Sequence, residues 1–431
     1  MRNEVWSQKK YFVKSYAHFD KRVSLKNTIK YVNNPKNIEK HGFYPFIHYS
    51  KIFLKYDKYR NEKKEKKRKI CYSSHIDRCI FQFYSYQLDT KYNDLIIKYK
   101  MNDSVIAYRT NLHKNNINFA KEAFDFIKNY DNCYVLVGDF TQFFDNLNHI
   151  YLKKMICNLL SVKKLPSDIY SVFKNITKYS IWDLESLLKL NKLENNFTGI
   201  KKLNKLDKVL SKEKFKQYKK KYIRKHSKHK GIPQGSPISA VLSNIYMLDF
   251  DKAITDFIKL QQGLYMRYSD DFILVFSNIK VVDFVFNEIN KIPDLEIANE
   301  KTQLYYFSEN KIKKCNDLIN LNDTSGKNDV NYLGFCFDGE KITFRDRTIS
   351  KYYRKLYGKT KTIVRNNGMT KTGKRISKKN LYLKYSIKGK SNNRGNFITY
   401  VEKSKEIFGE DVFIENIISK HMGKIKRAAK I

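Results

Sequence analysis

The chain has 431 residues, enough to bury a large core and to form two or three units of ordinary domain size. It carries 85 lysine and arginine residues against 43 aspartate and glutamate residues, a formal charge of +42. This charge favours a polyanionic partner, above all nucleic acid. A basic membrane-binding surface is the alternative, but no amphipathic segment with a clean apolar face accompanies the charge.

The cysteines and the amino terminus exclude several other classes. The six cysteines show no Cys-x-x-Cys spacing and no nearby pair of histidines, so neither a zinc site nor a disulfide framework is expected. Residues 1–14 are polar and charged and predict no secretory signal, and no apolar run approaches the length of a membrane span. The sequence therefore predicts a cytoplasmic protein with reduced thiols and no membrane contact.

The first 100 residues favour short elements followed by one helix. Residues 1–60 are basic, with aromatic patches at 16–20 and 41–46, and their mixed periodicity and a proline-bounded turn indicate short packed helices. The charged run 61–69 is most simply a solvated loop. Apolar residues then recur at helical spacing over 70–88. Asp77 is interpreted as an acid at the start of that helix.

A brief strand-like run follows at residues 105–110. Arg109 lies near its end and offers two parallel donors that match the oxygens of a triphosphate. The alternative is a surface arginine paired with a nearby acid.

The apolar strand at residues 134–138 runs directly into Asp139. An acid at the end of a buried strand usually faces a cleft, although an acid in a strand-terminating turn is the alternative. Asp145 is interpreted as the N-cap of the helix that follows, and no chemistry is assigned to it.

Residues 161–230 form a long connection that is strongly basic at its end. Residues 201–230 contain fourteen lysines and arginines against two acids. This pattern predicts a solvated arm or a helix pair whose charged face can meet a phosphate backbone. Residues 231–237 then open a helix, with Ser236 as N-cap, while Gly235 permits close approach and Gln234 offers a donor and an acceptor.

The run from Tyr265 to Phe276 reads as a β-hairpin with Asp270 and Asp271 between its two apolar strands. Adjacent carboxylates repel each other, so the pair is explained either by a cation or by the turn itself. Two further hairpins are expected, one over 294–307 that contains Lys301 and one that turns at residues 338–339.

The carboxyl-terminal part is basic and rich in tyrosine. Residues 347–401 contain sixteen lysines and arginines and no acid, with tyrosines interleaved. Charge and stacking of this kind fit a surface that follows a nucleic-acid strand. A final helix is expected over 403–428.

In this order the motifs resemble those of reverse transcriptases. The resemblance rests on Asp139 with Phe144, Pro233-Gln234-Gly235, Tyr268-Ser269-Asp270-Asp271, Glu300-Lys301-Thr302 and Leu333-Gly334-Phe335. It covers roughly residues 68–344 and is closest to the bacterial branch that includes retrons, group II intron enzymes and phage-defence (abortive-infection) enzymes. The patches at 16–20 and 41–46 resemble the amino-terminal region of the defence type.

The resemblance implies a metal-dependent catalytic site. Asp139 and Asp270 would bridge two Mg²⁺ ions, with Mn²⁺ as an alternative ion, and Asp271 would support them less directly. Lys301 would protonate the departing pyrophosphate.

The resemblance also implies contacts with the substrates. Arg109 would bind the phosphates of the incoming nucleotide, and Gln234 and Gly235 would contact that nucleotide and its template base. Phe144 would lie beneath the sugar and exclude a 2′-hydroxyl, which predicts the use of deoxynucleotides, although a core ring is the alternative. Residues 333–335 would hold the primer end.

The implied architecture is an α+β right-hand polymerase. Residues 1–130 would form the fingers with an amino-terminal extension, and residues 131–345 a palm with an antiparallel sheet. Residues 161–230 belong partly to the fingers or to a basic insertion, and residues 346–431 would form a basic helical thumb. No segment remains for a ribonuclease H, endonuclease or zinc domain.

Three hypotheses for the function remain open at this point. The first is an RNA-directed DNA polymerase that copies a noncoding RNA in antiphage defence, with RNA template, DNA primer or product, and deoxynucleotides as partners. The second is a related polymerase that is template-independent or protein-primed. The third is a catalytically silent RNA-binding scaffold. Partner proteins and a homo-oligomer are compatible with each of the three.

Overall fold

The computed structural model describes residues 12–57, 62–130, 132–319, 327–369, 373, 378–391, 395–409 and 421–429. The chain divides into two compact units. Unit 1 consists of residues 1–111, 140–255 and 286–296, and unit 2 of residues 112–139, 256–285 and 297–431. In the described part of the chain, no helix combines the length and the apolar composition needed to cross a membrane.

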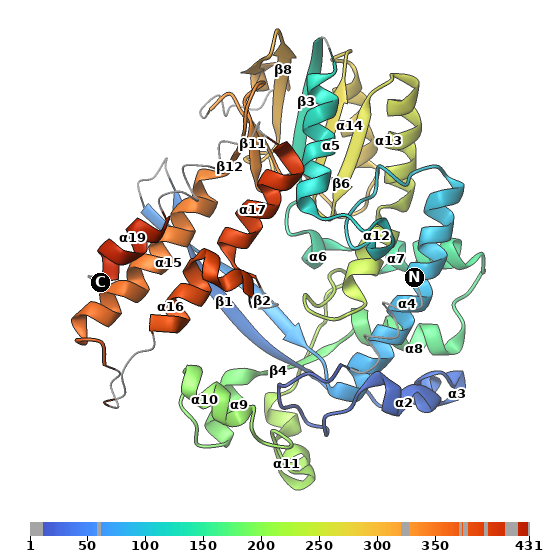
Figure 1. The fold of residues 1–431 in the computed structure, drawn as a ribbon. Coiled ribbons are helices and arrows are strands. Elements are labelled where there is room, and N and C mark those ends of the chain that lie inside the picture. Colours follow the sequence, from blue (N-terminus) through green and yellow to red (C-terminus); the bar gives the residue numbers. More distant parts are fainter. Residues whose placement is uncertain are drawn as a thin grey trace. The chain divides into compact units, whose positions relative to one another are not determined.

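Unit 1 combines helices with a four-stranded sheet in the order β2-β1-β4-β5 (Figure 1). The strands are β1 (Phe46–Asp57), β2 (Glu62–Tyr72), β4 (Ser180–Asp183) and β5 (Arg224–Lys225). The helices are α2 (Leu25–Val32), α3 (Pro35–Glu39), α4 (His75–Lys98), α6 (Phe143–Asn146), α7 (His149–Leu160), α8 (Ser167–Thr177), α9 (Leu184–Leu190), α10 (Phe197–Leu203), α11 (Lys212–Tyr222) and α12 (Ser239–Tyr246). The short η1 (Thr110–Leu112), α13 (Leu248–Leu260) and α14 (Val281–Asn290) have residues in both units.

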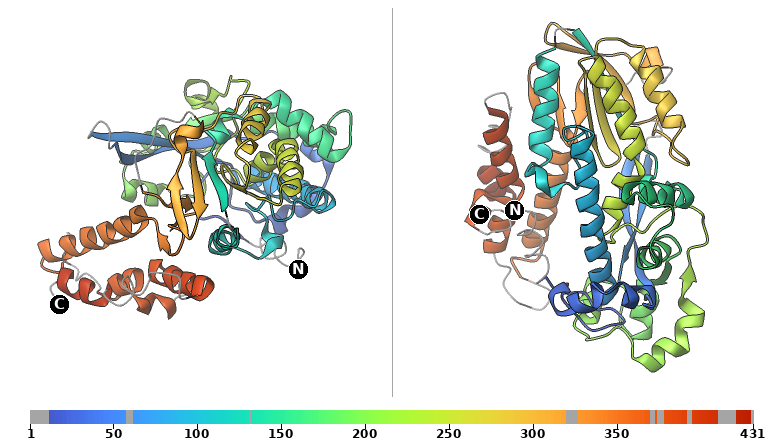
Figure 2. Two further views of the ribbon diagram at one scale, coloured as in Figure 1. Left: turned by 90° about the horizontal axis from the view of Figure 1, so that it is seen from above. Right: turned by 90° about the vertical axis from the view of Figure 1, so that its right-hand side faces the viewer.

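The expectation of a solvated loop over 61–69 is wrong for residues 62–69, which lie in β2, while residue 61 lies outside the described residues. Strand β2 pairs with β1 along its whole length, from Ile47↔Tyr72 to Asp57↔Glu62, and the two strands form a long ribbon (Figure 2). The described side chains of residues 67–69 are exposed. Because such exposed residues are charged on both faces of the strand, the sequence shows no apolar alternation there and does not indicate a strand.

The helix expected over 70–88 is α4, which begins at His75 and continues to Lys98. Asp77 lies in its first turn, as predicted, and is buried. Its carboxylate also accepts hydrogen bonds from His41 Nε2 at 2.8 Å and from the backbone N–H of Tyr44 at 3.0 Å. The acid therefore ties the 41–46 patch to the start of the helix.

Of the two alternatives for residues 201–230, a solvated arm or a helix pair, the structure favours helices, since α10 ends at Leu203 and α11 spans Lys212–Tyr222. The buried Trp182 lies at the centre of an apolar cluster, and the half-buried aromatic face of α11, including Phe215 and Tyr222, packs against it. Strand β4 pairs in parallel with the start of β1. The lysines of α11 remain exposed, as the charge pattern indicated.

Three further local predictions are wrong. Residues 105–110 form turns rather than a strand. The N-cap of α7 is Asn148, whose side chain accepts from the N–H groups of residues 150 and 151, whereas Asp145 lies within α6. Helix α12 begins at Ser239, whose hydroxyl bonds to the carbonyl of Pro233, so Ser236 is not its cap.

Unit 2 contains an antiparallel sheet of five strands in the order β6-β7-β3-β8-β9. These are β3 (Asn132–Asp139), β6 (Leu264–Tyr268), β7 (Asp271–Phe276), β8 (Gln303–Ser308) and β9 (Lys311–Lys314). The second expected hairpin is therefore formed by β8 and β9 over 303–314, later than predicted. Helix α5 (Asn116–Lys128) packs against β6 and β7.

A three-stranded sheet and helices complete the described part of unit 2. The strands are β10 (Val330–Tyr332), β11 (Phe335–Phe337) and β12 (Ile342–Phe344), which follow the short η2 (Asn316–Ile319). The turn at residues 338–339 joins β11 to β12 as predicted. The carboxyl-terminal elements are α15 (Asp346–Arg365), α16 (Lys378–Tyr385), η3 (Ile387–Ser391), α17 (Phe397–Phe408) and α19 (His421–Ala429). The single helix expected over 403–428 is represented by the end of α17 and by α19, and residues 410–420 lie outside the described residues.

Gly138 lies at the centre of the five-stranded sheet, where a side chain would overlap a neighbouring ring. It lies opposite Phe272 on β7, and a Cβ at this position would be 2.2 Å from Phe272 Cζ. We expect Gly138→Ala to lower the free energy of unfolding by about 1–3 kcal/mol, because the ring must move. Denaturant unfolding of the full chain measures this.

Two variants control that measurement. Gly138→Ala combined with Phe272→Leu should recover part of the loss, because the obstructing ring is gone. Gly42→Ala serves as the matched control, since a Cβ there meets nothing within 4 Å. Equal stability of Gly138→Ala and wild type would contradict the ring contact.

Candidate active site

The hairpin predicted around the paired acids is confirmed. Tyr268 at the end of β6 pairs with Asp271 at the start of β7, so Ser269 and Asp270 form a two-residue turn. Ser269 has a φ of 63°. Two-residue hairpins need a positive φ at the first turn position, where glycine is usual. A serine in this conformation must be stabilised by its surroundings.

Buried polar groups support this turn. Arg267 is 0% exposed, and its Nη1 donates to the carbonyl oxygen of Ser269 at 2.8 Å. The hydroxyl of the buried Tyr332 donates to the carbonyl oxygen of Met266 at 3.3 Å. These bonds hold the backbone that carries Asp270 in place.

The third acid reaches the same place through strand pairing. Asp139 is the last residue of β3, and the antiparallel register sets it directly opposite Asp271. Directly opposed residues in an antiparallel pair have side chains about 5 Å apart. Asp139, which lies 131 residues before Asp270, is thereby brought to the same end of the sheet as the adjacent Asp270 and Asp271.

The carboxyl groups influence each other's ionisation. Burial raises the pKa of Asp271 to about 7, and the charges of Asp270 and Asp139 and a hydrogen bond with Asp139 add to the effect. Burial and the charge of Asp139 also raise the pKa of Asp270. Close, partly buried carboxylates resist ionisation until a cation offsets their repulsion.

Lys301 supplies one positive charge beside these acids. It lies in the turn before β8, and its Nζ donates to Asp139 Oδ1 at 2.5 Å. The charge of the same ammonium group opposes the rise in the pKa of Asp270 and of Asp271. The family resemblance implies that this lysine is a proton donor, and that role stays a prediction. No pattern in the sequence indicated its contact with Asp139.

The chemistry of this group of acids fits a divalent cation. Carboxylate oxygens are the ligands that Mg²⁺ and Mn²⁺ prefer, and the raised pKa values of Asp270 and Asp271 show that one lysine does not offset their repulsion. Across the described residues, however, no three histidine, cysteine, aspartate or glutamate side chains are arranged as a ready metal site. The contact of Lys301 with Asp139 takes up one of the carboxylate oxygens in this arrangement.

A cavity of about 330 Å³ lies beside Asp271. It is lined by Asn116, Val137, Tyr268, Asp271, Asn331, Tyr332, Leu333, Gly334 and Arg345. Leu333 and Gly334 both have positive φ values, 48° and 96°. The turn that was expected to hold the primer end therefore lines the same cavity as one of the acids.

Asn116 is a residue of this cavity that the sequence reasoning missed. Its Nδ2 donates to the carbonyl oxygen of Leu333 at 3.1 Å and to the hydroxyl of Tyr400 at 2.8 Å. It thereby links the start of α5, the 333–334 turn and α17. Its neighbour Asn115 forms a capping box for α5.

Three of the predicted substrate-contacting residues lie near one another in unit 1. The backbone N–H of Ile232 bonds to the carbonyl of Phe144, and the carbonyl of Gln234 accepts from the N–H of Cys71 on β2. Gly235 has a φ of 115°, and a Cβ on it would be 2.4 Å from the Cys71 carbonyl oxygen. Only glycine fits this close approach.

Arg109 is held inside unit 1. It is 4% exposed, and its guanidinium donates to the side chains of Asn93 and Asn102 and to the carbonyl oxygens of residues 102 and 105. These bonds fix the turns of residues 102–109. The structure thus shows a supporting role for Arg109, and its contact with phosphate stays a prediction.

Strand pairing brings Asp139 and Asp271 together at the end of an antiparallel sheet, and the chain is strongly basic. This arrangement is a candidate site for nucleotidyl transfer. The sequence pattern of one family, described as reverse transcriptase (RNA-dependent DNA polymerase), matches residues 59–337. The chain belongs to this reverse transcriptase family. Membership, together with the mixed helices and antiparallel sheets, confirms the predicted α+β right-hand polymerase class. No curated protein matches the sequence.

The structure also matches several solved telomerase structures. Apo telomerase from Candida tropicalis matches at 13% identity and a TM-score of 0.41, over 98% of this chain and 66% of that chain. The same telomerase in complex with a TWJ fragment of telomeric RNA matches at 16% and 0.42, over 97% and 61%. Telomerase from Candida albicans with such a fragment matches at 14% and 0.39, over 94% and 62%. This chain thus spans less than two thirds of the length of each telomerase.

The raised pKa of Asp271 predicts pH-dependent binding of metal. Below about pH 7 its carboxyl is protonated and is a poor ligand. We expect Mg²⁺ to bind up to about tenfold more tightly near pH 8 than near pH 6. Calorimetric titration of the full chain measures this, and Asp271→Asn should bind more weakly with a flatter pH profile. Equal affinity of the wild type at both pH values would count against the raised pKa.

Proposed function

We propose that the protein is an RNA-directed DNA polymerase that adds deoxynucleotides to a primer end with the help of two Mg²⁺ ions. The observation that carries this is the pairing of Asp139 with Asp271, next to a turn that holds Asp270, in a chain of the reverse transcriptase family. Nucleotidyl transfer needs acids from separate chain segments around a shared pair of cations.

The three acids would hold the ions and Lys301 would serve the leaving group. Asp139 and Asp270 would each contact both ions and Asp271 would support them, as the proximity of the three carboxyl groups allows. When bound, such ions lower the pKa of the primer hydroxyl and offset the charge of the triphosphate. Lys301, beside Asp139, carries a proton that it would donate to the departing pyrophosphate.

Residues of unit 1 would select the nucleotide. Gln234 and Gly235, whose backbone lies against Cys71 of β2, would contact the incoming nucleotide and its template base. The half-buried ring of Phe144 would lie under the sugar and exclude a 2′-hydroxyl. We assign residues 1–130 to the fingers, 131–345 to the palm with 161–230 partly in the fingers, and 346–431 to the thumb.

We further propose that the template is a noncoding RNA and that the enzyme acts in the cytoplasm in antiphage defence. The resemblance of residues 16–20 and 41–46 to the amino-terminal region of defence-type enzymes supports this role. Sequencing the RNA that co-purifies with the protein tests the template. Plaque counts on cells that express the wild type or a variant without Asp270 and Asp271 test the defence role, and equal counts would refute it.

Incorporation by the purified protein tests the polymerase activity. The protein with its co-purified RNA is supplied with Mg²⁺ and labelled deoxynucleotides, and we expect DNA synthesis that ribonuclease treatment abolishes. Synthesis that continues after removal of RNA, with a product of biased composition, would indicate a template-independent polymerase. No incorporation by folded protein would indicate an RNA-binding scaffold.

Replacing Asp270 and Asp271 by alanine should reduce incorporation to below about a thousandth of wild type, because the ions lose their ligands. RNA binding should change less than twofold, since the basic segments 201–230 and 347–401 are untouched. Filter binding and incorporation are measured on the same preparation. Equal loss of both would show that the acids do not have a specific role in the chemistry.

Phe144→Ala should relax the discrimination against ribonucleotides. Removing the ring leaves room for a 2′-hydroxyl, and we expect the ratio of deoxynucleotide to ribonucleotide kcat/KM to fall by at least about tenfold. Phe143→Ala is the matched control, because Phe143 is the neighbouring ring, is 3% exposed and belongs to the core. Unchanged selectivity in folded Phe144→Ala would remove the ring from its proposed role.

A further inference from the structure

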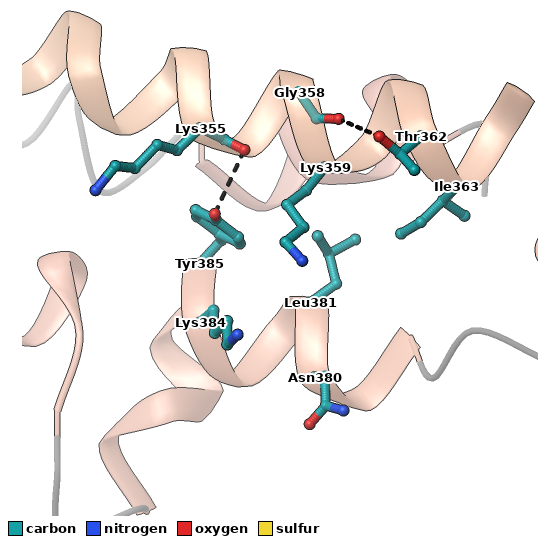
Figure 3. A pocket seen from close by; sticks show the side chains of 9 residues that line it. All are labelled: Lys355, Gly358, Lys359, Thr362, Ile363, Asn380, Leu381, Lys384 and Tyr385. Carbon is teal, nitrogen blue, oxygen red and sulfur yellow. Dashed lines mark hydrogen bonds between the residues drawn. The ribbon is translucent and has the colours of Figure 1, made fainter. Parts of the chain in front are cut away.

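A cavity of about 510 Å³ lies between α15 and α16 in the basic carboxyl-terminal part of unit 2 (Figure 3). Pockets that hold small ligands have volumes of this order. Its lining combines apolar groups, one aromatic ring and three lysines. The lining residues are Lys355, Gly358, Lys359, Thr362, Ile363, Asn380, Leu381, Lys384 and Tyr385.

The inner surface of this cavity is apolar. Ile363 and Leu381 are 9% and 4% exposed and belong to the apolar cluster that joins the two helices. In Figure 3 the Leu381 side chain points from α16 toward α15. The hydroxyl of Tyr385 donates to the carbonyl oxygen of Lys355 at 3.4 Å, which helps to fix the ring. Such a surface suits the face of a planar ring.

The outer part of the cavity is positively charged. Lys355 and Lys359 come from α15 and Lys384 from α16, and all three are exposed. Figure 3 shows the Lys359 side chain running from α15 toward α16. The whole segment 347–401 contains no acid, so no acidic neighbour in the sequence offsets these charges. An anionic group near the apolar surface would be favoured here.

Gly358 is unusual in this setting. It lies in the interior of the 20-residue helix α15, where glycine weakens a helix relative to alanine. A Cβ at this position would meet no atom within 4 Å, so packing within the fold does not require a glycine. The missing side chain widens the cavity, and an occupant would explain it.

We propose that this cavity binds one unstacked base of a single-stranded nucleic acid. The base would lie against Leu381 and Ile363 beside the Tyr385 ring, and the lysines would contact the phosphates on either side of it. Base stacking on an aromatic ring combined with lysine contacts to phosphate is the usual basis of single-strand binding. The proposal goes beyond the polymerase activity and rests on it only in that a polymerase handles single strands.

The observations favour a single strand over other occupants. A paired base is stacked within a duplex and cannot enter a cavity without being extruded. A free mononucleotide carries one phosphate group, whereas lysines from both helices, Lys355, Lys359 and Lys384, border the cavity. A strand supplies more than one phosphate to such a group of cations.

Gly358→Leu in the full chain tests the proposal directly. The leucine side chain would extend into the cavity, and we expect at least about tenfold weaker binding of a labelled single-stranded RNA of about ten nucleotides, measured by fluorescence anisotropy. Gly358→Ala is the matched control and should bind within about twofold of wild type. Both residues favour a helix, so neither variant should unfold at a lower temperature. Wild-type affinity of a folded Gly358→Leu variant would overturn the proposal.

Salt dependence gives a second measurement. Replacing Lys359 and Lys384 together by glutamine should reduce the slope of log Kd against log salt by about 1.4, because two contacts with single-strand phosphates are lost. A blunt-ended RNA duplex without unpaired bases should bind wild type and Gly358→Leu alike. Competition by uridine monophosphate at the same concentration as the oligonucleotide would show a free-nucleotide site and refute the single-strand assignment.

The two proposals can fail independently. The variant without Asp270 and Asp271 should bind the oligonucleotide as tightly as wild type while incorporating nothing. If the wild type also incorporates nothing but Gly358→Leu still weakens binding, the polymerase proposal fails and the cavity stands. If incorporation occurs and Gly358→Leu binds normally, the reverse holds.

Discussion

The register of β3 against β7 is the constraint on which the site depends. It places Asp139 opposite Asp271, and the two-residue turn beside it presents Asp270. A shift of one residue would turn Asp139 to the other face of the sheet. Gly138 and Phe272 occupy the neighbouring pair and fit only because the glycine has no side chain. Packing within the sheet therefore maintains the arrangement of charges at its end.

The same arrangement is costly without a cation. Burial and the charge of Asp139 raise the pKa values of Asp270 and Asp271, and Lys301 offsets only part of this effect. The buried Arg267 stabilises the turn through a hydrogen bond to the backbone carbonyl of Ser269. A protein that keeps such a group of acids together retains it for a reason other than stability. Membership of the reverse transcriptase family fits the proposal that these acids share the cations of nucleotidyl transfer.

Features encoded by short stretches could be predicted from the sequence. The hairpin around Asp270, the strand ending at Asp139 and the turn at 338–339 all depend on neighbouring residues, and each was found. Features that depend on distant partners were missed. Strand β2 is charged along its length and exists because it pairs with β1, and Asn116 acquires its role from contacts with residues 333 and 400. The contact of Lys301 with Asp139 spans 162 residues and has no local signal.

The ribbon of β1 and β2 has one further consequence. Strand β2 forms an edge of its sheet, and its outer backbone groups are a template on which another chain could pair. Its lysines keep such chains apart by repulsion, which weakens as the Debye length falls to about 3 Å at 1 M salt. The concentrated salt used to strip bound nucleic acid from a basic protein would therefore also remove this protection. Self-association during purification is the hazard that the ribbon brings, and a purification that lowers the salt promptly would limit it.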